Sequence, residues 1–418
     1  MARTITPQDC YTLINAMVRQ ATGQHSITAT DTSSFISAGE LVLASGMENV
    51  YNAINVVLSR MIVASRPYSA KLQLIQADES EYASRLRKVS FYSQDATPAG
   101  NFNTDLYTNF AAGFTAGEND PGTGPLSTKS QWEQHPAMPL EMNFAGVSTW
   151  QDCITMYEDA VKYAFSSEAE FARFVDGYLT EHGNDVQSQI ESWNRAAILN
   201  KIASVYDMSS VMTGSAIDLV AAFNTRFGTS YTGTDLRGTH LKEFLEFFVA
   251  LFKNTSDFLE ERSARHHWAV PKTVDGVQYS ILRHTPKRDQ RVILYGPLYK
   301  EAEAMVLPEI FRPGYLDMET QFEEVSFWQG ESNRSSISVT PAVTNTTTGV
   351  QQAGTAVALD YVVGMIFDRD ALMTNYRLDR VDTTVLEARK HYRNTWRSFA
   401  RNTISDNTEN CVIFYMAS

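Results

Sequence analysis

Cysteine is scarce in this chain of 418 residues, and its three copies, Cys10, Cys153 and Cys411, lie far apart. An odd number of cysteines without CxxC spacing indicates neither a disulfide framework nor a structural zinc site. Sparse cysteine is also typical of proteins that work in a reducing compartment. Stabilisation of the fold is therefore expected to come from its hydrophobic core.

Long apolar runs and a basic charge balance are missing as well. The nearest approach to a membrane span, Phe244–Phe252, is too short and contains Glu246, so we predict a buried helix there and no membrane segment. The first residues lack the charged and apolar regions of a signal peptide. A net charge of −13 disfavours a free nucleic-acid-binding protein, which would usually be basic.

Common catalytic and cofactor motifs are also absent. Gly117 and Gly122 have the spacing of a phosphate-binding loop, but Thr123 stands where its lysine is required. No GxGxxG follows a predicted strand, and neither HExxH nor GxSxG occurs. We therefore predict no catalytic residue, no cofactor, no metal site and no enzymatic activity.

Two polar clusters come closest to a metal site. His266 and His267 are adjacent rather than four residues apart, which favours a surface or interface role. Asp368-Arg369-Asp370 follows an apolar strand pattern but lacks the glycine and the distal glutamate of an EF-hand. We interpret this second cluster as a strand-ending turn.

What the sequence does contain is a long helical pattern from Ser166 to Tyr206. Its two parts are separated by the turn signal Gly183-Asn184-Asp185, where Asn184 is expected to cap a helix. Apolar residues recur on one face of the second part: Val186, Ile190, Trp193, Ala197, Ile198, Ile202 and Val205. The opposite face, with Gln187, Glu191, Arg195 and Lys201, suits solvent or a subunit contact. A continuous helix would be about 60 Å long; a pair of ordinary amphipathic helices is the alternative.

A projecting hairpin is predicted between Val89 and Met142. Its flanks, Arg85–Tyr92 and Met138–Phe144, have extended patterns that can pair antiparallel, whereas the middle is rich in Gly, Asn, Ser and Pro. A segment this long is unusual as a structureless loop in a compact domain; a disordered insertion is the alternative. We name three aromatic residues within it as candidate subunit-interface residues: Phe102, Phe110 and Phe114.

The stretch Tyr376–Arg401 is basic in an acidic chain. It holds seven basic and three acidic residues, a net charge of +4, with Tyr392, Trp396 and Phe399 interleaved. Alternating aromatic and basic residues can bind nucleic acid. Alternatively, they can pair with an acidic neighbouring subunit, which the charge of the whole chain favours. The candidate interface residues here are Arg389, Arg393 and Arg397.

Helix and strand patterns elsewhere predict an α+β protein in which helices and antiparallel strands are segregated. Helices are expected over Pro7–Ala21, Gly46–Ile62, Ser215–Phe227, Thr239–Phe258 and Ala302–Ile310. Strands are expected over Phe322–Trp328, over Val357–Phe367 with an interruption at Gly364, and over Cys411–Tyr415. The Ser/Thr/Asn-rich stretch Asn333–Val350 is expected to be a loop.

Several segments resemble the major capsid proteins of tailed double-stranded DNA bacteriophages. They are Ala164–Ser167 before the long helix, Ile281–Pro286 with Asp289–Arg291, Phe322–Gly330, Gly364–Ala371 and Asp406–Phe414. Each motif is loose by itself, and the set is specific through its order along roughly residues 160 to 418. Residues 1 to 160 agree in layout only.

The resemblance implies an HK97-like fold and a structural shell protein of the virion that assembles in the host cytoplasm. It implies these parts: N-terminal arm 1–65, E-loop and flanking strands 66–150, P-domain with the spine helix 151–214, A-domain 215–345, P-domain return strands 346–400 and C-terminal strand 401–418. The implied partners are further copies of the chain, in hexamers and pentamers, and non-specifically bound packaged DNA. Scaffolding, portal and decoration proteins are further partners of such shells, and no membrane is involved.

Two other classes of protein remain open at this point. An encapsulin-type bacterial cargo shell has the same fold, and its particles would contain a protein cargo and no DNA. A soluble hydrolase or ligand-binding protein would instead be a compact monomer in solution.

Overall fold

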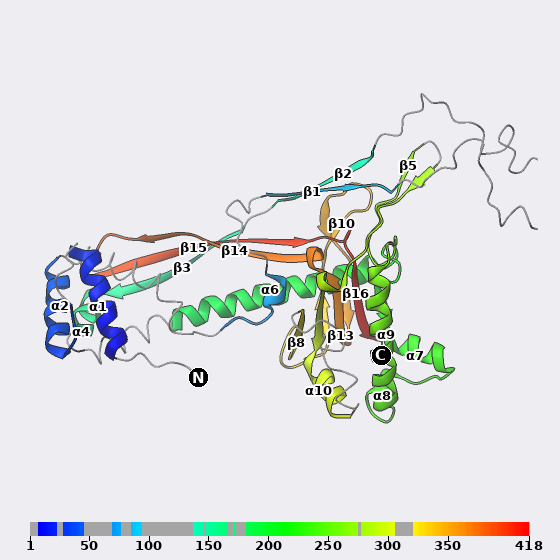
Figure 1. Ribbon diagram of the computed structural model, residues 1–418, viewed down its shortest axis with the longest axis horizontal. Helices are drawn as coiled ribbons and strands as arrows, with labels where there is room; N and C mark the ends of the chain where they lie inside the picture. The colour runs from blue at the N-terminus through cyan, green and yellow to red at the C-terminus, as the bar shows by residue number, and fades with distance from the viewer. Residues whose placement is uncertain are drawn as a thin grey trace, which may run out of the picture.

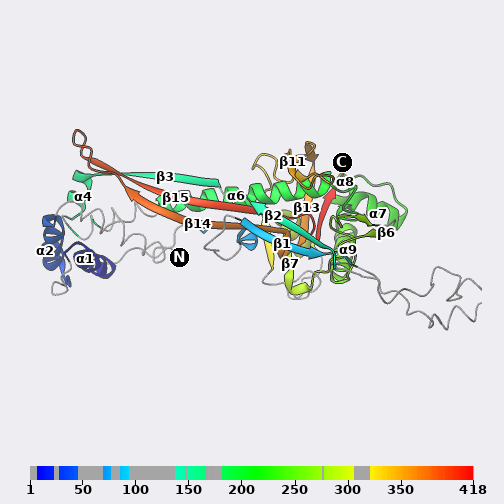
Figure 2. The ribbon, with the colours of Figure 1, turned by 90° about the horizontal axis from the view of Figure 1, so that it is seen from above.

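The computed structural model describes residues 7–22, 28–45, 69–76, 85–93, 137–145, 148–165, 167, 171, 181–274, 277–305 and 321–417. In these residues the molecule is elongated (Figures 1 and 2). A body of sheet and helices lies at one end and a cluster of helices at the other, with a long helix and a three-stranded sheet between them. A two-stranded ribbon runs along the upper side of the body in Figure 1.

The body is built on a five-stranded sheet of order β4-β16-β13-β7-β8. Its strands are β4 (Ala216–Asp218), β7 (Gln290–Tyr295), β8 (Phe322–Val325), β13 (Tyr361–Asp368) and β16 (Cys411–Met416). The central strands β13 and β16 are antiparallel and almost entirely apolar and buried, because both sheet faces are covered. The strands predicted at both places are confirmed. The predicted interruption at Gly364 is a bulge inside β13, where a Cβ atom would lie 2.5 Å from the Ile293 carbonyl oxygen.

Helices cover this sheet. They are α7 (Leu219–Phe227), α8 (Gly233–Arg237), α9 (Leu241–Glu260) and α10 (Gly296–Met305). On α9, Phe248 and Phe252 contact Phe414 of β16 with ring centroids 5.6 and 5.7 Å apart, so the predicted buried helix is confirmed. The helix predicted from Ser215 starts later, because Asp218 ends β4 and accepts a hydrogen bond from the Val220 amide as the cap of α7.

The long helix is α6 (Glu181–Asp207), whose 27 residues span about 40 Å. The predicted cap at Asn184 is wrong, because the helix runs through Gly183–Asp185 without a break. The predicted buried stripe is confirmed in its second half, where Ile198, Ile202 and Val205 are buried. Of the preceding predicted part, most residues lie outside the described ranges.

The polar face of α6 is covered by the chain itself, so its predicted exposure to solvent or a neighbouring subunit is wrong. Gln187 and Glu191 accept hydrogen bonds from the backbone amides of Ala70 and Lys71, at 3.2 and 3.3 Å. Arg195 lies over the Phe327 ring, 3.9 Å from its centroid. These contacts tie the segment that contains η1 (Gln73–Ile75) and the loop after β8 to the helix.

A three-stranded sheet, β14-β15-β3, runs beside α6 away from the body (Figure 1). Its strands are β3 (Ser148–Tyr157), β14 (Leu372–Thr383) and β15 (Tyr392–Ser405). Trp193 of α6 lies against it, stacked on Tyr376 of β14 and 5.1 Å from the ring of Trp150 of β3. Aromatic contacts at Trp193 therefore hold the helix against two strands of the sheet.

At the far end, α1 (Pro7–Thr22), α2 (Thr32–Ala44) and α4 (Glu158–Ala164) form a second hydrophobic core, separate from that of the body. Phe35 contacts Phe171 there, with ring centroids 5.6 Å apart. The helix predicted at Pro7–Ala21 is confirmed. The one predicted at Gly46–Ile62 lies outside the described residues.

The predicted hairpin flanks are confirmed as β1 (Arg85–Phe91) and β2 (Pro139–Ala145), which pair antiparallel from Arg85↔Ala145 to Phe91↔Pro139. We call this pair the β1–β2 ribbon. The stretch Asn333–Val350 is predicted as a loop, but it contains the short strands Ile337–Val339 and Ala342–Thr344. Each of them forms because it pairs with a strand later in the chain. The remaining short elements are β5 (Lys272–Val274), β6 (Val277–Tyr279), η4 (Lys287–Asp289), β9 (Ile337–Val339), β10 (Ala342–Thr344), β11 (Gln351–Ala353), β12 (Val357–Leu359) and η6 (Arg369–Ala371).

Candidate assembly site

Five consecutive polar residues, Asp406–Asn410, form the loop between β15 and β16, and all of them are buried. Buried polar groups are almost always hydrogen-bonded, so such a loop needs many partners. It supplies one itself: Asp406 Oδ1 accepts hydrogen bonds from the Thr408 amide and hydroxyl, at 2.8 and 2.7 Å. We call Asp406–Asn410 the 406–410 loop.

The long helix supplies a buried amino group to this loop. Lys201 Nζ donates to the Asp406 carbonyl oxygen at 2.7 Å and to Asn407 Oδ1 at 2.9 Å, and its side chain is fully buried. Asn407 in turn donates to Ser204 of the same helix at 2.8 Å. Burial lowers the pKa of Lys201. Placing Lys201 on the exposed face of the helix was therefore wrong.

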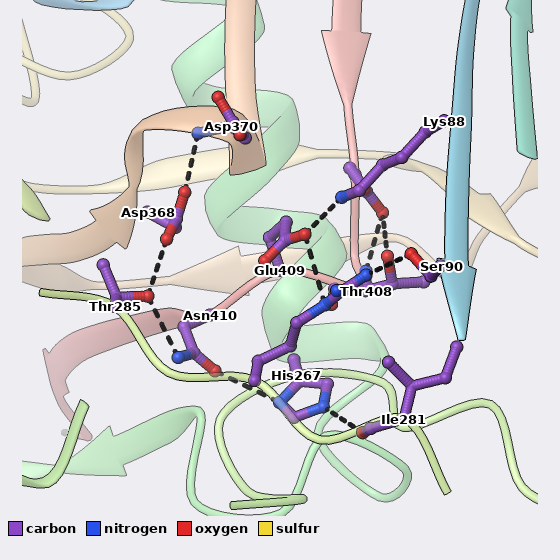
Figure 3. A network of polar contacts seen from close by, with 12 residues as sticks. Lys88, Ser90, His267, Ile281, Thr285, Asp368, Asp370, Thr408, Glu409 and Asn410 are labelled. Carbon is purple, nitrogen blue, oxygen red and sulfur yellow. Dashed lines mark hydrogen bonds and ion pairs between the residues drawn. The ribbon is translucent and has the colours of Figure 1, made fainter. Parts of the chain in front are cut away.

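His267 joins the loop to the segment that precedes β7. Its Nε2 lies 2.9 Å from the Ile281 carbonyl oxygen, and its Nδ1 lies 3.1 Å from Asn410 Oδ1 (Figure 3). The ring is fully buried, so the predicted surface or interface role of His266 and His267 is wrong for His267, and His266 is also buried. Burial lowers the pKa of both rings.

The network continues to the end of β13. Asn410 donates to Thr285 Oγ1 at 3.0 Å, and Thr285 donates to Asp368 Oδ2 at 2.7 Å (Figure 3). Asp368 Oδ1 accepts from the Asp370 amide at 2.8 Å, which makes the strand-ending turn that the sequence predicts. Burial raises the pKa of Asp368. Three segments that lie far apart along the chain, Ile281–Pro286, Gly364–Ala371 and Asp406–Phe414, thus meet in one place.

The β1–β2 ribbon is attached at the same place. Lys88 Nζ of β1 forms ion pairs with Asp406 and Glu409. Arg283 donates to Ser90 Oγ at 2.6 Å and pairs with Glu409 at 3.2 Å (Figure 3). Burial acts to raise the pKa of Asp406, but Lys88 and the hydrogen bonds from Thr408 together outweigh it, so this pKa is lowered. Burial raises the pKa of Glu409.

Sequence reasoning missed Lys88, Ser90 and Lys201 as members of this network. The available signal was the run of five polar residues directly before the apolar strand pattern Cys411–Tyr415, but such a run also suits an exposed turn. The sequence does not indicate which residues form hydrogen bonds and ion pairs with Lys88, Ser90 and Lys201, because the bonded residues lie more than 190 positions away along the chain.

The six candidate interface residues lie elsewhere. Phe102, Phe110 and Phe114 are outside the described residues. Arg389 is exposed in the turn before β15, Arg393 is half-buried in β15, and Arg397 is buried beside its cross-strand partner Asp152 of β3. Burial lowers the pKa of Arg397. The structure therefore does not bring these arginines together with the 406–410 loop.

Within the described ranges, no group of three or more His, Cys, Asp or Glu side chains could hold a metal ion. None of the helices described there is long and apolar enough to cross a bilayer.

The arrangement matches that of a solved bacteriophage capsid structure, from Staphylococcus phage Andhra. The alignment covers 84% of this chain and 86% of that chain, with a TM-score of 0.51 and 9% sequence identity. This chain has the fold of a bacteriophage capsid protein. The predicted α+β capsid fold is thereby confirmed, and the comparison gives no support to the encapsulin or soluble-enzyme alternatives.

Two further solved structures align over a similar length of the capsid fold but with lower scores. A chain in the structure of head fiber and inner core protein gp22 of native bacteriophage P68 has a TM-score of 0.48 and 10% identity, covering 84% of this chain and 86% of that one. The capsid of cyanophage P-SCSP1u has a TM-score of 0.40 and 12% identity, covering 85% and 90%. No family model and no curated protein matches the sequence.

Proposed function

We propose that this chain is the major capsid protein of a double-stranded DNA bacteriophage and self-assembles into the icosahedral shell of the virion. The observation that carries the proposal is the capsid fold shared with the Andhra structure over 84% of the chain. The elongated form, with separate cores at its two ends, also suits a subunit that completes its packing through neighbours. Its role is structural rather than enzymatic.

The division of the chain follows from this proposal. The helices near the N-terminus belong to the arm, and the β1–β2 ribbon is the root of the E-loop. α6 is the spine helix of the P-domain, with β3, β14 and β15 beside it. The A-domain begins at residue 215. Copies of the chain form hexamers and pentamers in the host cytoplasm, and scaffolding, portal and decoration proteins are further partners.

The packaged DNA is bound non-specifically. In this proposal the basic stretch Tyr376–Arg401 serves chiefly the fold and subunit contacts, because Arg397 is already buried against Asp152 of the same chain. Phe102, Phe110 and Phe114 remain candidates for contact with a neighbouring subunit.

Sedimentation velocity and negative-stain electron microscopy of the concentrated protein test the proposal. The chain is expressed alone and together with the other structural proteins of its virion. We expect closed shells in at least one condition, and double-stranded DNA in the particles from infected cells. A stable monomer in every condition, with a defined enzymatic activity, would overturn the proposal. DNA-free particles with a protein cargo would instead identify an encapsulin.

A further inference from the structure

The β1–β2 ribbon has two unlike faces. Alternate residues of β1 and their partners on β2 are exposed: Arg87, Val89, Phe91, Pro139, Glu141 and Asn143. The opposite face carries Lys88 and Ser90, which bond to the 406–410 loop and to Arg283, together with the half-buried Leu140, Met142 and Phe144 of β2. Because side chains alternate along a strand, one face is directed to the body and the other is left open.

The strongest described contacts between this ribbon and the body are polar. Among the ribbon residues whose side chains are described, none belongs to either hydrophobic core. The polar contacts are the ion pairs of Lys88, the Arg283–Ser90 hydrogen bond and, just past β1, the Ser93 amide donating to the Ser280 carbonyl oxygen at 3.1 Å. From β2, the Met142 sulfur lies 3.7 Å from the Thr408 hydroxyl. A ribbon attached in this way can separate from the body without opening a hydrophobic core.

Lys88 has the central position in this joint. It is the one described ribbon residue that pairs with both acidic residues of the 406–410 loop, and the side chains of Asp406 and Glu409 are only 3% and 9% exposed. Two buried carboxylates need nearby cations, and removing a cation from such a group leaves an uncompensated charge. The pairing also selects a direction, because Lys88 can reach both acids only when β1 lies across the loop.

We propose that Lys88 is a positioning residue for assembly, which sets the direction of the β1–β2 ribbon on the body through its ion pairs with Asp406 and Glu409. This inference rests on the proposed shell function and adds a joint to it. The joint is ionic, so the ribbon can be released while β16 and α6 stay folded. The second strand, β2, is carried along because its described strand pairing is with β1.

Hydrogen exchange on the unassembled full-length protein tests the joint directly. In Lys88→Gln we expect the amides of Arg85–Phe91 to exchange at least about tenfold faster, because the ribbon detaches, while those of β16 keep their protection. Lys88→Arg should restore most of the protection. The matched control is Arg87→Gln, whose pair with Glu141 lies within the ribbon on the exposed face, and which should leave ribbon exchange nearly unchanged.

Lys88→Gln could unfold the body by leaving Asp406 and Glu409 without their cation. The triple variant Lys88→Gln/Asp406→Asn/Glu409→Gln removes all three charges together, so it measures the loss of the ion pairs without that unpaired charge. Unchanged exchange of the ribbon amides in both variants would overturn the proposal. An equal loss of protection in the ribbon and in β16 of the triple variant would overturn it as well. Assembly is scored separately. Wild-type protein should form uniform shells, whereas the Lys88→Gln variant should form aberrant shells or no shells. If wild-type protein forms no shell at all, the proposed function fails, whereas the exchange result still decides the joint.

Discussion

At the scale of single residues, Lys201 places an amino group inside the protein, where it is held by oxygen atoms of the 406–410 loop. Its hydrogen bonds reach a backbone carbonyl and an amide side chain, so it connects the long helix to the turn that precedes β16. Leaving such acceptors without a donor costs more than the net strength of the hydrogen bonds themselves. Lys201 is therefore expected to stabilise the body.

Replacing Lys201 tests that role. We expect Lys201→Met, which keeps the apolar stem, to lower the free energy of unfolding by about 2 kcal/mol through the lost hydrogen bonds. Lys201→Ala should cost about 4 kcal/mol because it also leaves a cavity. Urea denaturation measures both. Lys300→Met is the exposed control and should change stability by less than about 0.5 kcal/mol. A Lys201→Met variant as stable as this control would contradict the role.

His266 and His267 make stability depend on pH. Burial, with Arg265 beside the first ring and Arg283 beside the second, lowers both pKa values below 6.5 in the folded state. Below pH 6.5 the unfolded chain then binds more protons than the folded one. We therefore expect the free energy of unfolding to fall as pH drops from about 7 toward 5.

Urea denaturation at several pH values measures this loss. His267→Asn should be less stable at neutral pH, because its hydrogen bonds to the 406–410 loop and Ile281 are lost, yet its stability should vary less with pH. The control His240→Asn, at a partly exposed ring far from the 406–410 loop in sequence, should keep the wild-type pH dependence. An unchanged pH dependence in His267→Asn would exclude this ring as its source.

At the scale of elements, the basic stretch Tyr376–Arg401 runs from β14 through a turn into β15, which holds three of its seven basic residues, and burial distinguishes its arginines. Arg397 lies opposite Asp152 in the β15–β3 register, whereas Arg389 is exposed in the preceding turn. Arg397 is expected to hold the three-stranded sheet together. Arg389 makes no such contact within the described sheet and remains a candidate for contact with another subunit.

Glutamine substitutions separate these roles. Arg397→Gln should lower the free energy of unfolding by about 1–3 kcal/mol, since Asp152 loses its cationic partner, while Arg389→Gln should change it by less than about 0.5 kcal/mol. Arg393→Gln combined with Arg397→Gln should impair shell assembly before it impairs DNA packaging. Normal empty shells with reduced, strongly salt-dependent DNA retention would instead favour phosphate contacts.

At the scale of the whole molecule, two hydrophobic cores stand at opposite ends, and a helix and a three-stranded sheet run between them (Figures 1 and 2). An elongated subunit of this kind presents long lateral surfaces, which symmetric assemblies require. The ribbon adds a further surface whose direction is set by ionic contacts. In the proposed function, these features supply the surfaces through which copies of the chain meet.

Much of the fold could be predicted from the sequence, because its signals are local. The α+β class, the helix α9, the strands β13 and β16 and the two extended strands of the ribbon all follow from apolar periodicity and alternation within short windows. The prediction of helices and strands was wrong where the local sequence pattern and the packing of the folded chain favour different structures. Gly183–Asp185 has a turn composition but continues α6, and β9 and β10 are too short for their patterns to be seen.

The candidate site was decided by the tertiary structure alone. Lys201 and His267 have polar side chains that predict exposure, but a loop from the far end of the chain buries them and accepts their hydrogen bonds. Lys88 is one of several charged residues in a strand until Asp406 and Glu409 are placed beside it. The sequence by itself predicts most of the long helices and strands, since their patterns depend on neighbours along the chain. Which buried charges compensate one another depends on contacts between residues hundreds of positions apart, and only folding brings these together.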